Sequence, residues 1–566
     1  MTHPCPLGSF EKNKGDRLTS SIQELVLDMQ TGRPATLSHR GMVTSPHSLA
    51  SAAGADVLRA GGSAVDAAIA TAAVLGVIYP HMTGMGGDAF WLIHDAKTGK
   101  VRYLNGGGRA AASADPAFFK SKGLSEVPFR GIWPATLTTP GAVSSWCEAH
   151  NAYGKLGLPR ILAGAIDYAH NGYPVSQRLA GWMQRSQADC SAQPGWSALF
   201  TPDGTLPSTG DKRRNPALAR TLQAVAEQGQ AGFYQGETGK ALAALSKQHG
   251  GFFTAEDLMR QQAEWGEPLV GSYRDLTLYQ TPAPTQGFTV LQMLKLVEPF
   301  ELHKKDFFDP ERIHLMVQAK QISYHDRDRW LGDPTFTDMP MAQLLSDAYL
   351  DQRRMLINHE KALAWDQVPS YGSLRGDTVY IAVVDEHGQA VSLIHSLYGA
   401  FGSGVVSLDT GVLLQNRSAY FSLQDGHPNV LAPSKIPMHT LIASIGFRQN
   451  KLWSVMGCMG ADGQPQIQFQ AYSAMMDHGL DIQQAVEAPR WLSGRFALGE
   501  ARDTLHVESR LGSANLDALA AKGHVLNRWG AWNELAGHAH GITLEGPQQT
   551  RFGGSDPRSD GAATGY

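Results

Sequence analysis

A threonine at the start of an apolar run is the residue of this sequence best suited to chemistry. Thr378 follows Gly376 and Asp377 and opens residues 378–384, which are mainly β-branched or aromatic and typical of a buried strand. A threonine hydroxyl is a weak nucleophile without a base beside it, and its own α-amine can be that base if the preceding peptide bond is cut. Thr378 is therefore either a nucleophile exposed by cleavage or an ordinary strand threonine.

Helical segments precede Thr378, and strands follow it. Residues 138–260 have helical periodicity, and residues 311–365 are mixed helical and charged. After Thr378 we expect two strands, a loop, further strands, a helix at 482–487 and a last strand at 541–544. Residues 1–40 are polar and predicted to be flexible, and the Gly-, Ser- and Asp-rich tail from about residue 550 is predicted to be disordered. This order favours helical layers packed on central antiparallel sheets.

Composition restricts the kind of protein. The chain has 566 residues, a formal net charge of −4 and four scattered cysteines with no CxxC pair. A near-neutral balance favours neither nucleic acid nor a membrane surface as a partner. The cysteine pattern is typical of a reducing compartment. Since residues 1–14 have no apolar signal-peptide core and no apolar stretch near the start could span a bilayer, we expect a cytoplasmic protein.

Several motifs around Thr378 occur in a fixed order. Gly-Asp-Thr is followed by Phe-Gly-x-Gly at 401–404 and Gly-x-Leu-Leu-x-Asn at 411–416, and this series resembles the γ-glutamyltransferase family of self-cleaving N-terminal-nucleophile hydrolases. Further matching segments are 60–68, 139–143, 232–236, 250–252 and 456–462. The resemblance implies an αββα sandwich, in the α/β (α+β) class, with two antiparallel sheets between helical layers and a helical part in the large subunit. It implies no cofactor.

The resemblance also implies a precursor that cuts itself between Asp377 and Thr378. The products would be a large subunit, 41–377 after the flexible 1–40 segment, and a small subunit, 378–566, that carries the nucleophile. Thr378 would attack the preceding carbonyl, and the resulting ester would be hydrolysed. The mature threonine would then attack an amide carbonyl while its α-amine relays the proton. The two subunits are each other's partners, and a dimer of such pairs is compatible with the resemblance.

The family's other catalytic residues transfer to named positions. Ser396 stands where the family has a hydroxyl that supports the amine of the nucleophile, and Gly460 and Ala461 stand in its oxyanion loop. Arg109 lies close to the family's substrate-binding arginine, with a slightly shifted register. Ser396 could also be an ordinary strand serine.

The substrate pocket departs from the family pattern. The family's acid falls at Tyr420 and its preceding glutamine at Arg417, while Tyr398 replaces an amide side chain and His439 and Thr440 replace two serines. These changes make the pocket more cationic, so a substrate α-ammonium would lose its partner there. Arginine binds carboxylates bidentately, which favours an anionic substrate without an amino group. Arg417 could instead be a structural ion-pair partner.

Two signatures, Leu-Leu-Gln-Asn-Arg at 413–417 and Pro-x-His-Thr at 437–440, are similar to those of a subgroup that includes oxamate amidohydrolases. We therefore predict an amidohydrolase acting on a small carboxylate-bearing amide such as oxamate. A γ-glutamyltransferase or glutathione hydrolase is the first alternative. A β-lactam side-chain acylase is a second, because the loop between Phe421 and Pro437 is shorter than the lid of glutathione-processing relatives. An inactive scaffold homologue is a third.

Other motifs predict no further chemistry. His538 and His540 are two residues apart on a predicted strand and point the same way, but no nearby carboxylate or cysteine completes a metal set. The glycines at 84–87 lack the full spacing of a dinucleotide loop. We predict neither a metal nor a nucleotide cofactor.

Overall fold

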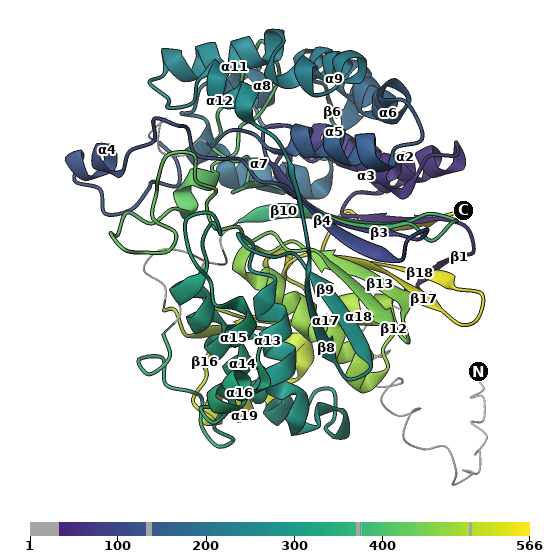
Figure 1. Ribbon diagram of the computed structural model, residues 1–566, viewed down its shortest axis with the longest axis vertical. Helices are drawn as coiled ribbons and strands as arrows, with labels where there is room; N and C mark the ends of the chain where they lie inside the picture. The colour runs from purple at the N-terminus through teal and green to yellow at the C-terminus, as the bar shows by residue number, and fades with distance from the viewer. Residues whose placement is uncertain (1–32, 132–137, 370–373, 375, 497–500) are drawn as a thin grey trace, which may run out of the picture.

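Two seven-stranded antiparallel sheets lie face to face between helical layers (Figure 1). The computed structural model describes residues 33–131, 138–369, 374, 376–496 and 501–566. The first sheet has the order β19-β2-β10-β11-β3-β4-β7. Its strands are β2 (Met42–Ser45), β3 (Asp88–Asp95), β4 (Lys100–Gly106), β7 (Glu264–Gly266), β10 (Asp377–Val384), β11 (Ala390–Tyr398) and β19 (Ala562–Gly565).

The second sheet has the order β1-β18-β17-β13-β12-β9-β8. Its strands are β1 (Thr36–Ser38), β8 (Leu269–Tyr273), β9 (Leu276–Gln280), β12 (Ser444–Arg448), β13 (Lys451–Cys458), β17 (Ala539–Glu545) and β18 (Thr550–Ser555). A small third sheet joins β14 (Trp491–Ser493), β15 (Thr504–Glu508) and β16 (Val525–Trp529). The predicted αββα arrangement is confirmed.

Helices cover the outer face of each large sheet (Figure 1). Those over the first sheet are α2 (Ser48–Arg59), α3 (Ala64–Ile78), α5 (Ala142–Tyr153), α6 (Leu158–Asn171), α7 (Gln177–Cys190), α8 (Trp196–Phe200), α9 (Pro216–Gln228), α10 (Gln230–Tyr234), α11 (Glu237–Gln248) and α12 (Ala255–Arg260). Those over the second are α13 (Phe288–Val297), α14 (Pro310–Trp330), α16 (Asp347–Arg354), α17 (Gln464–His478), α18 (Ile482–Glu487) and α19 (Ser513–Ala521).

The strand β10, which begins at Asp377, is buried on both faces. Val379, Ile381 and Val383 belong to the core shared with the first helical layer. Tyr380, Ala382 and Val384 belong to the core between the two sheets. Because successive side chains of a strand point to opposite faces, an unbroken apolar run is what a strand between two cores requires. The two cores on either side of β10 therefore explain the apolar run from which a buried strand was predicted.

The alanine-rich segment forms α3, which is buried along its whole length. Ser63 and Asp66 form a reciprocal capping box that satisfies the first amides of the helix. Small side chains allow α2 to approach α3 closely, and a Cβ on Gly54 would lie 2.3 Å from the Thr71 hydroxyl. This close helix pair supports the face of β10 and β11 opposite the second sheet.

The prediction of a disordered tail from about residue 550 is wrong. β18 pairs with β17 and β1, and β19 pairs with β2 at the edge of the first sheet. The glycines of this segment serve packing, because a Cβ on Gly553 would lie 2.8 Å from the Met42 sulfur. The glycine-rich composition was therefore misinterpreted as a sign of disorder, whereas the small residues allow close packing between strands.

Two other expectations need correction. Within the predicted flexible segment 1–40, residues 36–38 form β1, paired with β18, while residues 1–32 lie outside the described residues. The helix α17 was not anticipated after Thr378, although the helix at 482–487 is confirmed as α18. Nearly all of α17 is buried, including Gln464, Gln466 and Gln468, so it lacks the polar face by which an amphipathic helix is recognised in a sequence.

A buried ionic cluster ties the C-terminal segment to the rest of the small subunit region. Asp556 accepts hydrogen bonds from the Arg490 guanidinium at 2.5 Å and the Ala539 amide at 2.8 Å, and Arg558 bridges it to Glu508. Arg490 and Arg558 hold the pKa of Asp556 well below its ordinary value despite burial. Arg490 also donates to the Gly537 carbonyl, beside the loop that follows β13.

Asp556→Asn should lower the unfolding midpoint at pH 7, because removing one partner leaves buried arginines unpaired, a loss of about 3–5 kcal/mol. The folded protein depresses the pKa of Asp556 below the value of about 3.9 that an unfolded aspartate has. The resulting stabilisation is fully present above that unfolded pKa and is lost as the pH falls towards the folded pKa. The difference between wild type and variant in urea unfolding should therefore shrink below about pH 4. If the free energies of unfolding of wild type and variant differed by the same amount at pH 7 and pH 3, Asp556 would not be the group with the depressed pKa.

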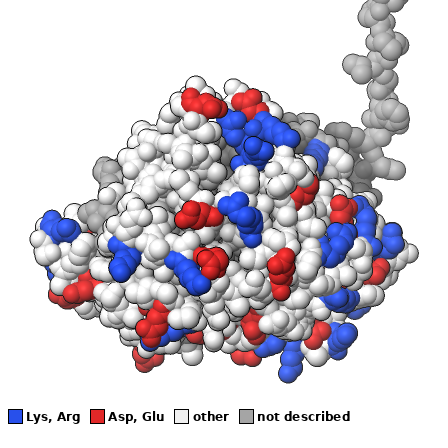
Figure 2. All heavy atoms as spheres, turned by 90° about the horizontal axis from the view of Figure 1, so that it is seen from above, with Lys and Arg blue, Asp and Glu red and all other residues white. Residues whose placement is uncertain are grey.

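Figure 2 shows acidic and basic side chains intermixed over most of the face above the first helical layer. Among the described residues, no helix is both long enough and apolar enough to cross a bilayer.

Candidate functional site

Thr378 lies at an irregularity in the pairing of two central strands. Asp377 pairs with Tyr398 and Val379 pairs with His395, so the register between β10 and β11 shifts at Thr378. Such bulges commonly redirect a side chain out of the regular alternation. Thr378 is 2% exposed, and its hydroxyl donates to the Ser396 hydroxyl at 3.1 Å.

Ser396 connects Thr378 to the peptide bond that precedes it. The Ser396 hydroxyl donates to the carbonyl oxygen of Asp377 at 2.7 Å and accepts from the Tyr398 amide at 2.8 Å. The carbonyl of the predicted cleavage site therefore already has a hydrogen-bond donor. The structure brings Asp377, Thr378 and Ser396 together as the sequence predicted.

Arg417 contacts this group through Ser396. It is fully buried, and its Nη2 lies 3.3 Å from Ser396 Oγ, while Nη1 lies 3.5 Å from the Thr440 hydroxyl. Its guanidinium carbon lies 4.7 Å from the centre of the Tyr398 ring. Desolvation by burial lowers the pKa of Arg417, partly offset by nearby Asp88. One hydroxyl group thus separates this guanidinium from Thr378.

Asp88, which the sequence analysis did not single out, faces Arg417. Its Oδ1 accepts from the Gly108 amide at 2.7 Å and the Gln415 side chain at 3.1 Å, and its Oδ2 lies 3.6 Å from Arg417 Nε. Burial raises the pKa of Asp88 to about 7, against the opposing effect of Arg417. The pocket is therefore less cationic than the substitutions at Arg417 and Tyr420 alone indicated.

Tyr398 and Tyr420 form an aromatic wall beside Arg417. Their ring centres lie 5.0 Å apart, and Phe129 packs against Tyr398 from the other side. Tyr398 has a φ of 78°, a left-handed conformation that a bulky residue adopts only when its surroundings enforce it. The Tyr420 hydroxyl donates to Asp462 at 2.8 Å. Tyr420 is thus a hydrogen-bond donor where the family's acid would stand.

The predicted oxyanion loop follows the end of β13. Gly460 and Ala461 have φ values of 136° and 48°, so both occupy the region that favours glycine. Within the described part of the chain, their amide N–H groups have no hydrogen-bond acceptor. The Met459 amide, by contrast, is held by the His538 carbonyl at 2.9 Å. The loop therefore has two adjacent amides available for an oxyanion.

A buried network supports the loop from behind. Arg327 Nη1 donates to Asp462 and to the side-chain oxygen of Gln286, both at 2.7 Å. The amide nitrogen of Gln286 donates to the carbonyls of Thr440 at 2.9 Å and Ala461 at 3.3 Å. Gln286, Arg327 and Asp462 thus connect the oxyanion loop to the pocket wall, and none of them has a local sequence signal that separates it from an ordinary core polar residue.

His439 and Thr440 are buried beside Asp88 and Arg417. The His439 ring packs edge-on against Phe90 at 4.6 Å, and its Nε2 lies 3.9 Å from Asp88 Oδ2. Burial and the nearby Arg417 charge lower the pKa of His439 well below its ordinary value, so the ring is neutral at pH 7. Both residues lie beside Arg417.

Arg109 lies apart from this group. Its guanidinium donates to Glu264 at 2.8 Å and to the Ser434 carbonyl at 3.2 Å, and it lies 3.8 Å from Asp333. Its neighbours Gly107 and Gly108 do border the site, since a Cβ on Gly107 would lie 3.3 Å from His439 Nε2. The segment reaches the pocket, but the predicted substrate-binding side chain is engaged elsewhere.

Two cavities flank the predicted cleavage site. One of about 250 Å³ is bordered by Gly376, Asp377 and Gly460, so the oxyanion loop and the scissile carbonyl share it. The other, of about 720 Å³, is lined on one side by Tyr398, Tyr420 and Asp462. Its rim adds aromatic and charged residues that include Phe129, Phe421, Phe496, Arg495 and Arg502.

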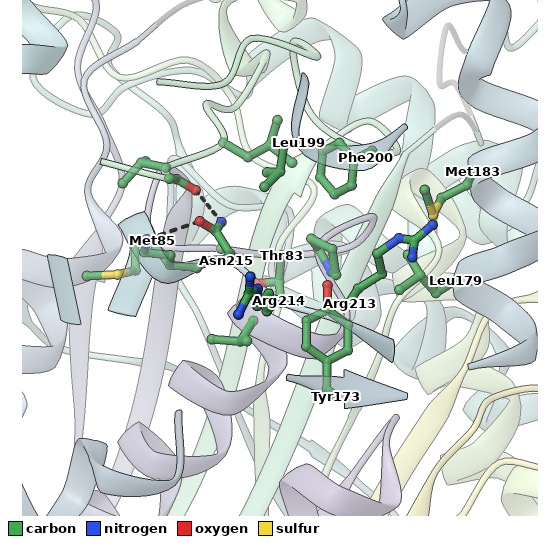
Figure 3. A pocket seen from close by; sticks show the side chains of 18 residues that line it. Thr83, Met85, Tyr173, Leu179, Met183, Leu199, Phe200, Arg213, Arg214 and Asn215 are labelled. Carbon is green, nitrogen blue, oxygen red and sulfur yellow. Dashed lines mark hydrogen bonds between the residues drawn. The ribbon is translucent and has the colours of Figure 1, made fainter. Parts of the chain in front are cut away.

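A third cavity lies between α7, α8, α9 and the segment before β3, and Thr378 is not among the residues that line it (Figure 3). Thr83, Met85, Tyr173 and Arg213 line it, and the Asn215 side chain donates to the Gly411 carbonyl at its edge. Its volume of about 30 Å³ is close to that of one water molecule, too little for an amide substrate. We therefore assign no function to it.

The described residues contain no cluster of three or more His, Cys, Asp and Glu side chains placed to hold a metal. His538 and His540 lie buried at β17, near Asp556 and Arg490. Burial lowers the pKa of His538 to about 3 and that of His540 to about 4, so both rings are neutral beside the ionic cluster at the C-terminal segment.

Asp88 had a weak signal in the sequence. It is a charged residue directly after a glycine pair and at the start of the otherwise apolar segment 89–93. Buried acids are rare unless they are paired, which makes such a position worth examining. Its pairing with Arg417 could not be seen, because the two residues are more than three hundred positions apart.

The stacked antiparallel sheets between helical layers define the fold of the N-terminal-nucleophile hydrolases, with the predicted cleavage site at the start of the central strand β10. The sequence profile described as Gamma-glutamyltranspeptidase matches residues 50–566. The chain belongs to the gamma-glutamyltranspeptidase family and is an enzyme of the amidohydrolase type.

Individual relatives cover almost the whole chain. The Glutathione hydrolase-like YwrD proenzyme of Bacillus subtilis is 38% identical over 531 residues, covering 94% of this chain and 99% of that protein. The Oxamate amidohydrolase proenzyme of Klebsiella pneumoniae is 36% identical over 537 residues, with the same coverage. The crystal structure of cephalosporin acylase from Bacillus halodurans matches with a TM-score of 0.87 and 35% identity, covering 94% of this chain and 97% of that one.

Proposed function

We propose that the chain cuts itself between Asp377 and Thr378 and then acts as a threonine amidohydrolase on a small amide that carries a carboxylate, such as oxamate. The names of two relatives, both proenzymes, support self-cleavage. One of them is an oxamate amidohydrolase. The contacts of Thr378, Ser396 and Arg417 support the chemistry.

Self-cleavage starts at the Thr378 hydroxyl. Its oxygen attacks the Asp377 carbonyl carbon, and the negative charge that develops on the carbonyl oxygen is stabilised by the Ser396 hydroxyl, which already donates to it at 2.7 Å. The proton that the threonine hydroxyl gives up passes to the amide nitrogen and the C–N bond breaks, which leaves Asp377 as an ester on the threonine oxygen and frees the α-amine. Water then hydrolyses the ester and releases the carboxylate of Asp377.

Turnover reuses the same residue. The freed α-amine takes the proton of the Thr378 hydroxyl, whose oxygen attacks the amide carbonyl of the substrate. The amides of Gly460 and Ala461 receive the oxyanion, and the proton passes to the leaving nitrogen, which departs as ammonia when the substrate is oxamate. Water attacks the ester and releases oxalate. Ser396 keeps the threonine in place through its hydroxyl contact.

The position of Arg417 is the observation on which the substrate proposal depends. In oxamate the carboxylate is bonded directly to the reacting carbonyl, so it must bind within a few ångströms of the Thr378 oxygen. A buried guanidinium that contacts Ser396 at 3.3 Å is placed at that range. Charge-assisted hydrogen bonds of this kind are roughly twice as strong as neutral ones.

The large cavity favours a second candidate, an acylase for bulkier amides. Oxamate needs little of a space of about 720 Å³ with aromatic walls, and binding sites of this size accommodate drug-sized molecules. The structural similarity to a cephalosporin acylase supports the same alternative. In that case Arg417 would still bind a carboxylate of the acyl group.

The first experiment measures ammonia release from oxamate together with hydrolysis of a matched pair of anilides. γ-Glutamyl-p-nitroanilide carries an α-ammonium, whereas glutaryl-p-nitroanilide has the carboxylate without it. We expect turnover of oxamate and a preference for the glutaryl compound, because Tyr420 offers no anion to an ammonium. Turnover of γ-glutamyl-p-nitroanilide alone would establish the glutathione hydrolase alternative, and glutaryl turnover without oxamate turnover would establish the acylase.

We also propose a cytoplasmic location. Cys147, Cys190 and Cys458 are buried free thiols, which suits a reducing compartment.

A further inference from the structure

The two carboxylate oxygens of Asp88 are held unequally. Oδ1 accepts two hydrogen bonds, from the Gly108 amide and Gln415, while Oδ2 has no hydrogen-bond partner among the described residues. Arg417 Nε likewise makes no hydrogen bond there, although it lies 3.6 Å from Oδ2. Both residues are fully buried. The pair is thus in electrostatic contact but not locked in the bidentate geometry that arginine and a carboxylate prefer.

Among the residues that the structure describes, His439 and Tyr234 are the other titratable groups that interact with Asp88. His439, from the loop before β12, lies 3.9 Å from Oδ2 and is kept neutral by burial. The charge of Asp88 contributes to the raised pKa of Tyr234 at the end of α10. After the proposed cleavage, the α-amine of Thr378 also lies nearby. Within the uncut chain, Arg417 is the charged partner of Asp88 among the described residues, and whatever else binds that guanidinium competes with Asp88.

We propose that Asp88 is a specificity-determining residue, which neutralises Arg417 in the free enzyme and takes up one proton when the carboxylate of a substrate binds this guanidinium. The inference rests on the proposed function, in which Arg417 binds that carboxylate. Two carboxylates that share one buried guanidinium repel each other, and protonation of one removes the repulsion. The proton comes from solvent. A neutral amide brings no charge and requires no proton.

The direction of the pH dependence follows from this linkage. The pKa of Asp88 is about 7 in the free protein, and a second carboxylate raises it further. Below about pH 7 Asp88 is already protonated, and the KM for oxamate should be independent of its titration. Above it, proton uptake accompanies binding, and the KM should rise by up to about tenfold per pH unit. The KM for oxamide, the neutral amide of similar shape, should lack this rise.

Asp88→Asn keeps the shape of the side chain and abolishes its titration. For this variant the KM for oxamate should stay flat from pH 6 to 9 and should lie about tenfold below the wild-type value at pH 8. The α-amine of Thr378, which titrates near 7.7–8.0, affects both proteins, so the difference between their profiles isolates Asp88. A variant that loses kcat equally for oxamate and oxamide at every pH would show a merely structural role and overturn the proposal.

A second measurement on the wild-type mature enzyme does not depend on the variant folding. Pyruvate has the carboxylate and carbonyl of oxamate but no amide bond, and its binding can be measured by calorimetry in two buffers of different ionisation enthalpy. We expect uptake of close to one proton at pH 8 and none at pH 6. Binding without proton uptake at pH 8 would overturn the role of Asp88 and leave the proposed function intact. Failure of pyruvate to bind, together with no oxamate turnover, would overturn the proposed function itself.

Discussion

Thr378→Ala should leave the chain as a single uncut band of 61.1 kDa and should abolish ammonia release. The variant lacks the oxygen that attacks the Asp377 carbonyl, and without cleavage no α-amine is freed to act as the base. Both steps of the proposed chemistry therefore fail together, and loss of a nucleophile commonly costs a factor of about 10⁴ or more in rate. Denaturing gels beside an ammonia assay measure both effects, and the wild type should give two fragments that separate between residues 377 and 378.

Two further variants test the assignment. Thr378→Ser keeps a hydroxyl, so it should still be cut, more slowly, and should keep part of the activity. Ser396→Ala removes the donor to the Asp377 carbonyl and should slow cleavage by about 10²-fold, the typical effect of losing one oxyanion donor. N-terminal sequencing of the small fragment should begin at Thr378. A Thr378→Ala protein that is still cut at this position would refute the role of Thr378.

Arg417→Gln should reduce kcat/KM for oxamate by about 10²- to 10³-fold, or about 3–4 kcal/mol, which is in the range for removing one partner of a buried charged pair. The glutamine keeps hydrogen-bonding capacity but cannot balance a carboxylate. The same variant should change kcat/KM for neutral oxamide much less. The ratio of the two substrates is the decisive measurement, since it cancels any general loss of active protein.

The controls for this prediction address the neighbours of Arg417. Arg417→Lys keeps the charge without the planar guanidinium and should recover part of the oxamate activity. Because Arg417→Gln leaves Asp88 buried without its cation, the double variant Asp88→Asn with Arg417→Gln separates that penalty from the loss of substrate binding. The cut fraction on gels corrects for any effect on self-cleavage through Ser396. Equal losses for oxamate and oxamide would show that Arg417 is a structural ion-pair partner.

Some features of this protein follow from the local order of residues. The unbroken apolar run after Thr378 determines a strand buried on both sides, because each face of β10 needs a core of its own. The capping box at Ser63 and Asp66 and the small residues that follow determine the close packing of α3. The motifs from Gly376 to Asn416 were sufficient to indicate the family, and the family determines the order of the layers.

The tertiary structure decided which of the named residues meet. The sequence indicated Arg109 and Arg417 as two cations of one pocket, but only the structure shows that Arg109 contacts Glu264, Asp333 and the Ser434 carbonyl, whereas Arg417 contacts Ser396. The role of Asp88 could be inferred only from the pairing of β3 with β11. The packing of the C-terminal glycines could be inferred only from the residues that lie close to them in the fold. Local patterns specify backbone conformation and burial, because these depend on neighbouring residues. The pairing of a buried charge depends on which distant segment packs against it, and no local pattern encodes that contact.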